Sequence, residues 1–271
     1  MATITAADVK KLRDATGAGM MDAKKARTEA EGDFDAAVEI LRVTGQAKMA
    51  NRSDRDASNG LVASAGKTVI QLAAETDFVA KNAEFMALAA EIASAVDAAG
   101  AHGVEAASQV ALPSGKTVTE AISELAVKIG EKLELAAAAT FSGPVVIYLH
   151  RRSADLPPQV GVMVEHEGGE VDFVRGIAMQ IAAMSPAYVT RDEVPTHVLD
   201  NERKIAELTA KEEGKPEQII PRIVEGRLGG FYKEVCLVEQ VSVSDDKKTV
   251  GQLLKANGVE VKRFVRFAAG S

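Results

Sequence analysis

Cysteine and aromatic residues are the scarcest components of this 271-residue sequence, which contains one cysteine, no tryptophan and 4% aromatic residues. Cys236 has no second cysteine to pair with, so an intramolecular disulfide is excluded and a cysteine-based metal site is disfavoured. A single cysteine also fits a reducing compartment. The shortage of aromatic side chains argues against an aromatic-lined ligand pocket and against a surface on which nucleic-acid bases stack.

Basic charge and long apolar runs are also in short supply. The formal net charge is −7 and the isoelectric point is about 5.3, whereas a broad nucleic-acid surface needs clustered Lys and Arg that displace counterions. We therefore expect no direct contact with nucleic acid. The apolar runs are too short or too interrupted by charge to span a bilayer, and the charged N-terminal stretch lacks the apolar region of a signal peptide. These features predict a cytoplasmic protein that makes no membrane contact.

Motifs of covalent chemistry and of cofactor binding are missing as well. The sequence has no Walker-type phosphate loop, no dinucleotide fingerprint and no nucleophile elbow. Its four histidines lack metal-ligand spacing, and His166 is expected on the solvent face of a strand. Cys236 is expected to be buried and inert in an apolar strand. The chain is thus predicted to be no enzyme, with no cofactor and no metal.

The first forty-five residues predict a small three-helix module. Thr5 fits an N-cap, and glycines at positions 17 and 19 separate the first two helices. Residues 46–59 are polar and charged and predict a linker, or a helical extension that frays into one. A unit of this size has a thin hydrophobic core, which is typical of a docking module. The expected helices are Ala6–Ala15, Met20–Ala30 and Phe34–Leu41.

From residue 60 onward the pattern predicts an α+β core of two related subdomains with antiparallel sheets, residues 60–140 and 141–267. Both halves read as a hairpin, an Asp-Phe-Val tripeptide and a helix. The tripeptide occurs at 77–79 and at 172–174, which indicates an internal duplication. The elements expected in order are a hairpin around Ala65-Gly66, helices at 83–100 and 117–141, strands at 143–150 and 159–169, and a helix at 172–186.

A charged helical segment is expected as an insertion in the second subdomain. Residues 191–230 are charged and predict an exposed helical hairpin, and Gly229-Gly230 is expected to end the helical stretch. The elements expected after it are a strand at 231–240, a helix at 249–258 capped by Thr249, and a strand at 259–270.

The stretch Thr76-Asp77-Phe78-Val79 lies where a strand pattern gives way to a helix pattern. Phe78 could fill the core, and Thr76 or Asp77 could cap the helix; from spacing alone, capping is the better-supported role for these two. Alternatively, the turn could act as a wedge for another molecule.

Three further residues are candidates for contact with a partner. Met20 and Met21 begin the second helix after a glycine turn, and methionine is a soft, adaptable side chain that is common at binding surfaces. Filling the core is an equally good role for at least one of the two. His150 ends a strand, where it could cap, ligate or contact a partner, and an ordinary surface position is the default interpretation.

Several long motifs occur together in the order of a known protein family. The segments that resemble bacterial elongation factor Ts are TAADVKKLRDATGAGMMDAKKARTEAEGDFDAAVEILR, ETDFVAKN, KPEQIIPRIVEGRLGGFYKEVCLVEQ, KTVGQLLKANG and VKRFVRF. The resemblance covers nearly the whole chain in colinear order. It implies an N-terminal module like a ubiquitin-associated domain, a core of two α+β subdomains and a protruding helical hairpin formed by residues 187–226.

The resemblance also implies a function and a partner. Members of this family are guanine nucleotide exchange factors for elongation factor Tu, the GTPase that delivers aminoacyl-tRNA during translation elongation. The positions that match the family's motif, Thr76, Asp77, Phe78 and Val79, are implied to disturb the Mg²⁺ site of the partner so that GDP leaves and GTP can bind.

Further residues are assigned by the same matching. Met20, Met21 and His150 are implied to contact the GTPase domain of elongation factor Tu. The second copy of the tripeptide, with Asp172 and Phe173, is implied to have no wedge role. Whether the protein forms a homodimer or a 2:2 complex with its partner stays open.

Two other functions remain as alternatives. A non-catalytic adaptor or chaperone-like module would bind a partner tightly without changing the rate of nucleotide release. A small enzyme would have to use His150 or Cys236, and the sequence offers neither of them a partner group in a catalytic pattern.

Overall fold

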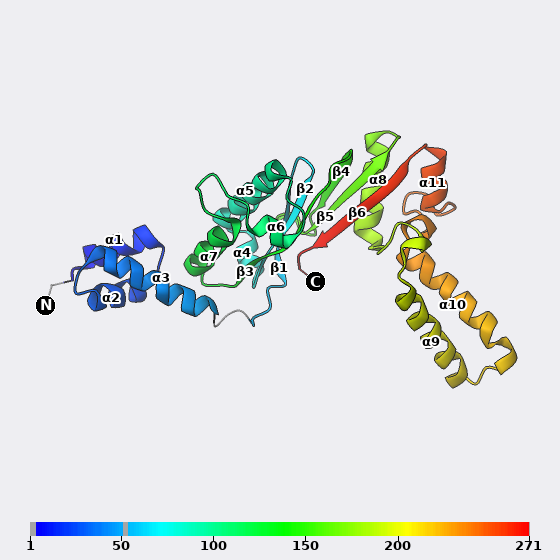
Figure 1. Cartoon of the computed structure of the whole chain (residues 1–271), viewed down its shortest axis with the longest axis horizontal. Coiled ribbons are helices and arrows are strands. Elements are labelled where there is room, and N and C mark those ends of the chain that lie inside the picture. The colour runs from blue at the N-terminus through cyan, green and yellow to red at the C-terminus, as the bar shows by residue number, and fades with distance from the viewer. Residues whose placement is uncertain (1–3, 51–53, 271) are drawn as a thin grey trace. The chain divides into compact units, whose positions relative to one another are not determined.

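The computed structural model describes residues 4–50 and 54–270, without the side chains of residues 46–50. Its first helices are α1 (Ala6–Thr16), α2 (Met20–Glu29) and α3 (Phe34–Ala50) (Figure 1). Thr5 and Asp8 form a capping box at the start of α1, and Gly17 ends that helix with a positive φ of 68°. The side chains buried between the helices are Val9, Leu12, Ala23, Ala26, Ala37 and Leu41.

Helix α3 is longer than the sequence pattern predicted. The expected end at Leu41 is wrong, because the helix continues to Ala50. Most residues of 42–50 favour or tolerate helical conformation, so loss of the apolar periodicity does not end the helix. The predicted linker at 46–59 therefore begins as a helical extension. Its residues 51–53 lie outside the described residues.

The described chain divides into two compact units. One contains the described residues through Thr140, together with Arg151–Val160 and the described residues from Phe267 onward; the other contains Phe141–His150 and Gly161–Arg266. The subdomain boundaries expected from the sequence remain predictions.

The first unit contains an antiparallel sheet of order β1-β2-β3, formed by Asn59–Ala65, Thr68–Ala74 and Leu133–Thr140. Helix α5 (Ala83–Ala99) packs on β1 and β2, and α7 (Val118–Ile129) packs on β3. The shorter helices are α4 (Asp77–Ala80) and α6 (Val104–Ser108). Phe85, Ile70 and Ile92 are fully buried in the resulting core.

The strand β3 corrects the prediction of a single helix at 117–141. The helix ends at Ile129, because Gly130 adopts a left-handed conformation with φ of 87°. Residues Leu133–Thr140 then pair with β2 along its whole length, from Leu133 opposite Ala74 to Thr140 opposite Thr68. Leu and Ala favour helix locally, and pairing with a strand from elsewhere in the chain overrides that preference.

The second unit contains most of an antiparallel sheet of order β4-β5-β6, formed by Val145–His150, Val160–Glu167 and Glu260–Ala268. Helix α8 (Val171–Met184) contacts β4. Two strands followed by Asp-Phe-Val near the start of a helix thus occur in both halves of the core, as the internal repeat predicted. The α+β class is confirmed.

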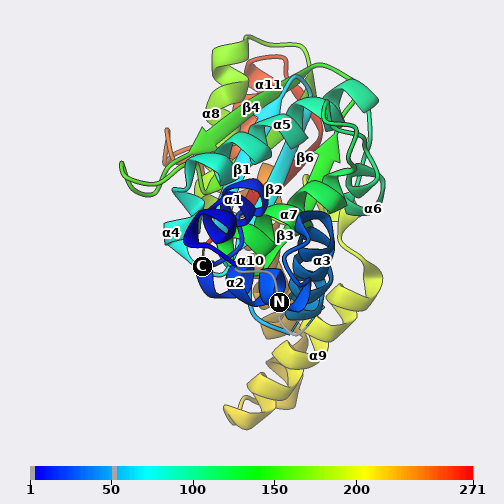
Figure 2. The same cartoon turned by 90° about the vertical axis from the view of Figure 1, so that its left-hand side faces the viewer.

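Helices α9 (Thr196–Glu212) and α10 (Ile220–Val235) form a helical hairpin that extends from the sheet of the second unit (Figures 1 and 2). Its small interior is formed by Ala206, Ala210, Ile220, Val224 and Leu228. The remaining elements of this unit are α11 (Val250–Ala256), which begins with a capping box at Thr249, and the 3₁₀ turns η1 (Arg191–Glu193), η2 (Glu217–Ile219) and η3 (Leu237–Glu239).

Two expectations for this region are wrong. Gly229-Gly230 does not end the helical stretch, and residues 231–240 form the end of α10 and the turn η3 rather than a strand. Leu228 and Tyr232 lie four residues apart, and both pack into the interior of the hairpin, so the helix is stabilised across the glycines by contacts with α9.

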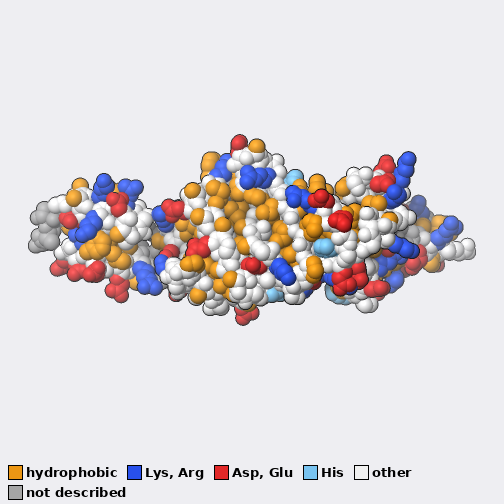
Figure 3. All heavy atoms as spheres, turned by 90° about the horizontal axis from the view of Figure 1, so that it is seen from above, with side chains coloured by type: hydrophobic (Ala, Val, Ile, Leu, Met, Phe, Trp, Pro, Cys, Tyr) orange, Lys and Arg blue, Asp and Glu red, His pale blue; other side chains and the backbone are white. Residues whose placement is uncertain are grey.

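No helix in the described part of the chain is long and apolar enough to cross a membrane. On the face drawn in Figure 3, the Lys and Arg side chains of the described residues are interspersed with Asp and Glu side chains. Charges of both signs therefore lie close together on that face.

Candidate functional site

The stretch that matches the family motif forms a tight turn at the end of β2. Thr76 is the N-cap of α4, and its hydroxyl accepts a hydrogen bond from the Val79 amide at 3.4 Å. Val79 and Ala80 are buried, with Val79 in the main core of the first unit. Phe78, by contrast, is 78% exposed. The turn is therefore anchored by Val79 and Ala80, and it presents Phe78 to solvent.

The exposure of Phe78 follows from the packing of its neighbour Val79 in the core. Phe85, seven residues later, is fully buried in the core. Adjacent residues of a helical turn point about 100° apart, so burial of Val79 directs Phe78 outward. An exposed Phe forgoes about 1.5–3 kcal/mol of burial free energy. The interpretation of Phe78 as a core residue is wrong, and an exposed ring is available to a partner.

The exposed ring lies beside a lysine that also pairs with Asp77. The Lys81 ammonium lies 5.7 Å from the centroid of the Phe78 ring and 3.8 Å from the Asp77 carboxylate. Asp77 and Lys81 are partly exposed, so their ion pair is screened by water and contributes little to stability. Thr76, not Asp77, provides the side-chain cap of this turn. The Asp77 carboxylate thus remains on the surface beside the ring.

The methionine pair lies at the start of α2, where Gly19 is the N-cap and makes no side-chain hydrogen bond. Met20 is 48% exposed and Met21 is 77% exposed. Neither belongs to the buried cluster of the three-helix segment. The core-filling interpretation is therefore wrong for both residues. Two adjacent methionines form an exposed, adaptable apolar surface.

His150 is the last residue of β4 and is exposed. Its Nδ1 lies 2.9 Å from the Tyr148 hydroxyl, and the two ring centroids are 6.0 Å apart. The Arg175 guanidinium lies 5.9 Å from the centroid of the Tyr148 ring. These contacts hold the imidazole in an aromatic and cationic surface environment.

The residues considered for chemistry do not form a catalytic arrangement in the described part of the chain. Cys236 is fully buried, and burial raises the pKa of its thiol above the ordinary value, which disfavours the reactive thiolate. His166 is buried, so its predicted solvent-facing position is wrong; its Nδ1 lies 3.0 Å from the Gly168 carbonyl oxygen. Among the described residues, no group of three or more His, Cys, Asp or Glu side chains is arranged to hold a metal ion.

The structure places the sequence-predicted residues on three separate elements. Thr76, Asp77, Phe78 and Val79 share one turn, the methionines are on α2, and His150 is on a strand of the second unit. Two residues that contact the turn, Lys81 and Glu131, were not predicted from the sequence. The spacing of four residues between Asp77 and Lys81 was a usable signal. Glu131 is 55 residues from Thr76, and no local pattern connects them.

Comparison with known proteins identifies the family. A family model described as Elongation factor TS matches residues 75–271. Elongation factor Ts of Cutibacterium acnes is 66% identical over 267 residues, which are 98% of this chain and 99% of that protein. Elongation factor Ts of Nocardioides sp. is 56% identical over 272 residues and covers both chains completely, and that of Mycolicibacterium smegmatis is 54% identical over 274 residues, 100% of this chain and 99% of the other.

The matched family model begins at Glu75, directly before the turn that exposes Phe78, and the relatives also extend over the three-helix segment. The resemblance based on sequence motifs is thereby confirmed, and this chain belongs to the elongation factor Ts family.

Proposed function

We propose that this chain is a guanine nucleotide exchange factor that binds elongation factor Tu with GDP and promotes GDP release during translation elongation. Membership of the elongation factor Ts family supports this function. The observation that carries the proposed mechanism is the exposed Phe78, held in a turn whose next two residues are buried. No covalent chemistry is required of the chain, and the proposal involves no cofactor of its own.

The proposed mechanism acts on the metal ion of the partner. A GTPase holds GDP through phosphate contacts and through Mg²⁺, whose charge offsets that of the diphosphate. An apolar ring inserted between helices of the partner displaces the elements that hold the metal. The Asp77 carboxylate beside the ring adds negative charge and competes for hydrogen bonds there. Weaker binding of Mg²⁺ then weakens the binding of GDP.

This coupling between sites is reciprocal. If the factor weakens nucleotide binding, nucleotide weakens the binding of the factor by the same ratio. The factor therefore accelerates exchange in both directions and does not set the equilibrium between GDP and GTP. The cellular concentration of GTP determines which nucleotide replaces GDP.

The other exposed residues extend the proposed contact with the partner. Met20 and Met21 supply an apolar surface on the three-helix segment, and His150 supplies a polar one on β4. We also propose that the three-helix segment is a docking module with the boundaries expected from the sequence. The protein is proposed to act in the cytoplasm. Contact with elongation factor Tu is proposed to involve protein surfaces alone, with no nucleic acid or membrane.

The test is release of a fluorescent GDP analogue from purified elongation factor Tu in millimolar Mg²⁺, with and without catalytic amounts of this chain. Strong acceleration supports exchange activity. Complex formation without acceleration overturns it and favours the adaptor or chaperone-like function. The assay is then repeated after Mg²⁺ has been removed with a chelator. The acceleration is expected to shrink, because the metal contribution is already absent, and an undiminished acceleration would contradict the metal-based mechanism.

A further inference from the structure

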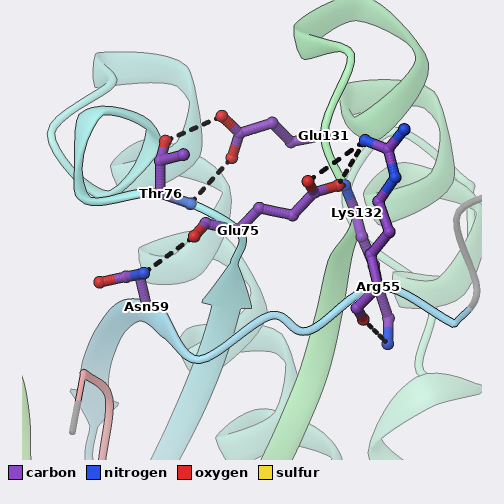
Figure 4. Close-up of polar contacts among 6 residues, drawn as sticks. All are labelled: Arg55, Asn59, Glu75, Thr76, Glu131 and Lys132. Atoms are coloured by element: carbon purple, nitrogen blue, oxygen red, sulfur yellow. Dashed lines mark hydrogen bonds and ion pairs between the residues drawn. The ribbon is translucent and has the colours of Figure 1, made fainter.

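Glu131, at the junction of α7 and β3, makes two hydrogen bonds to the first residue of the Phe78 turn. The Thr76 amide donates to Glu131 Oε2 at 3.0 Å, and the Thr76 hydroxyl donates to Glu131 Oε1 at 2.8 Å (Figure 4). The Thr76 hydroxyl also accepts a hydrogen bond from the Val79 amide. Its single O–H donor and one of its lone pairs are therefore both used. A continuous set of hydrogen bonds thus runs from Glu131 through Thr76 into the turn.

A second carboxylate makes the opposite connection. Glu75 Oε1 accepts a hydrogen bond from the Lys132 amide at 2.6 Å, and the Glu75 backbone carbonyl accepts one from the Asn59 side chain at 2.8 Å. The Arg55 guanidinium lies 3.3 Å from Glu75 Oε2. Figure 4 shows these residues grouped where the end of β2 lies beside the start of β3.

These contacts continue the β2–β3 register beyond the last backbone pair. The ladder ends where Ala74 lies opposite Leu133, so the next two positions of β2 fall opposite Lys132 and Glu131. At those positions each carboxylate binds the backbone amide of the facing residue. Hydrogen bonds to the two glutamate side chains therefore replace backbone pairing where the β2–β3 ladder ends. Hydrogen bonds that involve an ionised carboxylate are stronger than neutral ones.

The turn depends on such external contacts for its order. Helix α4 has four residues, and a single helical turn is unstable without tertiary contacts, because nucleation fixes several dihedral angles for one hydrogen bond. Burial of Val79 and Ala80 anchors its C-terminal half. The bonds from Glu131 to Thr76 anchor its N-terminal end. Phe78, between the two anchors, is exposed in a defined backbone conformation.

We propose that Glu131 is a positioning residue for nucleotide exchange. By binding Thr76 at two atoms, it holds the turn in the conformation in which Phe78 meets the partner, so that binding does not have to order the turn. This inference rests on the proposed function, because it assigns Glu131 a role only if Phe78 acts on the partner. It concerns the free state of the factor, since every contact that carries it lies within this chain.

The first test compares Glu131→Ala with Glu124→Ala in the full-length chain, by the rate of GDP-analogue release from elongation factor Tu. Glu124 lies on α7 and pairs with Lys116 at 2.5 Å on the exposed surface, so its variant removes a carboxylate without touching the turn. Glu131→Ala is expected to lower exchange efficiency roughly 5- to 30-fold, which corresponds to the conformational entropy lost when binding has to order one backbone residue. Glu131→Gln keeps one acceptor oxygen and is expected to give an intermediate value.

The second test places Glu131→Ala in the background of Phe78→Ala. If Glu131 acts through Phe78, the two losses are not additive, and the double variant exchanges nucleotide no more slowly than Phe78→Ala alone. Fully additive losses, or normal exchange by Glu131→Ala, would overturn the positioning role. A merely structural role would lower exchange by the same factor in both backgrounds, and it would lower stability without producing this coupling.

The same measurements separate this inference from the function on which it rests. If Phe78→Ala exchanges nucleotide normally, the wedge mechanism fails and takes the role of Glu131 with it. If Phe78→Ala loses exchange while Glu131→Ala does not, the wedge stands and the positioning role fails. Should Glu131→Ala not fold, Glu131→Gln replaces it in both backgrounds, and the same coupling criterion decides the outcome.

Discussion

Replacing Phe78 by Ala is the most direct perturbation of this protein. The exposure of the ring predicts a small effect on stability, whereas the proposed function predicts a large effect on nucleotide exchange. Phe78 is 78% exposed, and its described aromatic contact is with the Lys81 ammonium, 5.7 Å from the ring centroid. An exposed cation–π pair contributes about 0.5–1 kcal/mol. We therefore expect Phe78→Ala to lower the free energy of unfolding by less than about 1 kcal/mol.

The matched control is Phe85→Ala, which makes the same chemical change at a fully buried position of the same unit. Truncating a buried Phe costs about 3–5 kcal/mol, because transfer free energy is lost and a cavity remains. Denaturant unfolding of the two variants should therefore separate them clearly. Equal destabilisation would show that Phe78 contributes to the core, and the reasoning from its exposure would be refuted.

The functional consequence is expected to be large. If the ring becomes buried in elongation factor Tu, its removal costs about 1.5–3 kcal/mol of interaction, which corresponds to a loss of roughly 10- to 150-fold in exchange efficiency. The assay is GDP-analogue release in millimolar Mg²⁺, measured over a range of factor concentrations. Phe173→Ala, at the second copy of the tripeptide, should leave exchange unchanged. Normal exchange by Phe78→Ala would refute the wedge.

Three further predictions concern other elements. Replacing Met20 and Met21 together by Ala should raise the dissociation constant for elongation factor Tu roughly tenfold while stability changes little, because both side chains are exposed; titration of the complex and thermal unfolding measure the two effects. A hydrogen bond from Arg191 holds the pKa of Glu239 below its ordinary value of 4.5. The stability that the ionised Glu239 contributes is therefore complete above pH 4.5 and is lost as the pH falls through the lower pKa of the folded state. When the free energy of unfolding is measured against pH, Arg191→Ala should differ most from the parent near neutrality and least in acid. Gly229→Ala should stabilise the protein by about 0.5–1 kcal/mol, because the helical position has open space for a Cβ atom, and a lower unfolding midpoint would contradict this.

Local sequence determined most of the elements and the family. Capping residues such as Thr5 and Thr249, apolar residues at helical spacing and β-branched runs located most helices and strands, because each of these signals depends on residues a few positions apart. The motifs spread along the chain indicated the family, and the one around Phe78 indicated the candidate surface. They left open whether the ring faces the core or the solvent, since spacing alone is compatible with either.

Tertiary structure decided the questions that depend on residues far apart in the chain. Residues 133–140 favour helix locally and become a strand because β2 supplies a pairing partner. Residues 231–235 remain helical because α9 supplies apolar contacts to α10. Phe78 is exposed because the core accepts Val79 instead, and Thr76 is held by a carboxylate 55 residues away. The physical reason is common to all of these cases: burial and hydrogen-bond satisfaction are properties of the assembled surroundings, whereas caps and periodicity are properties of neighbouring residues.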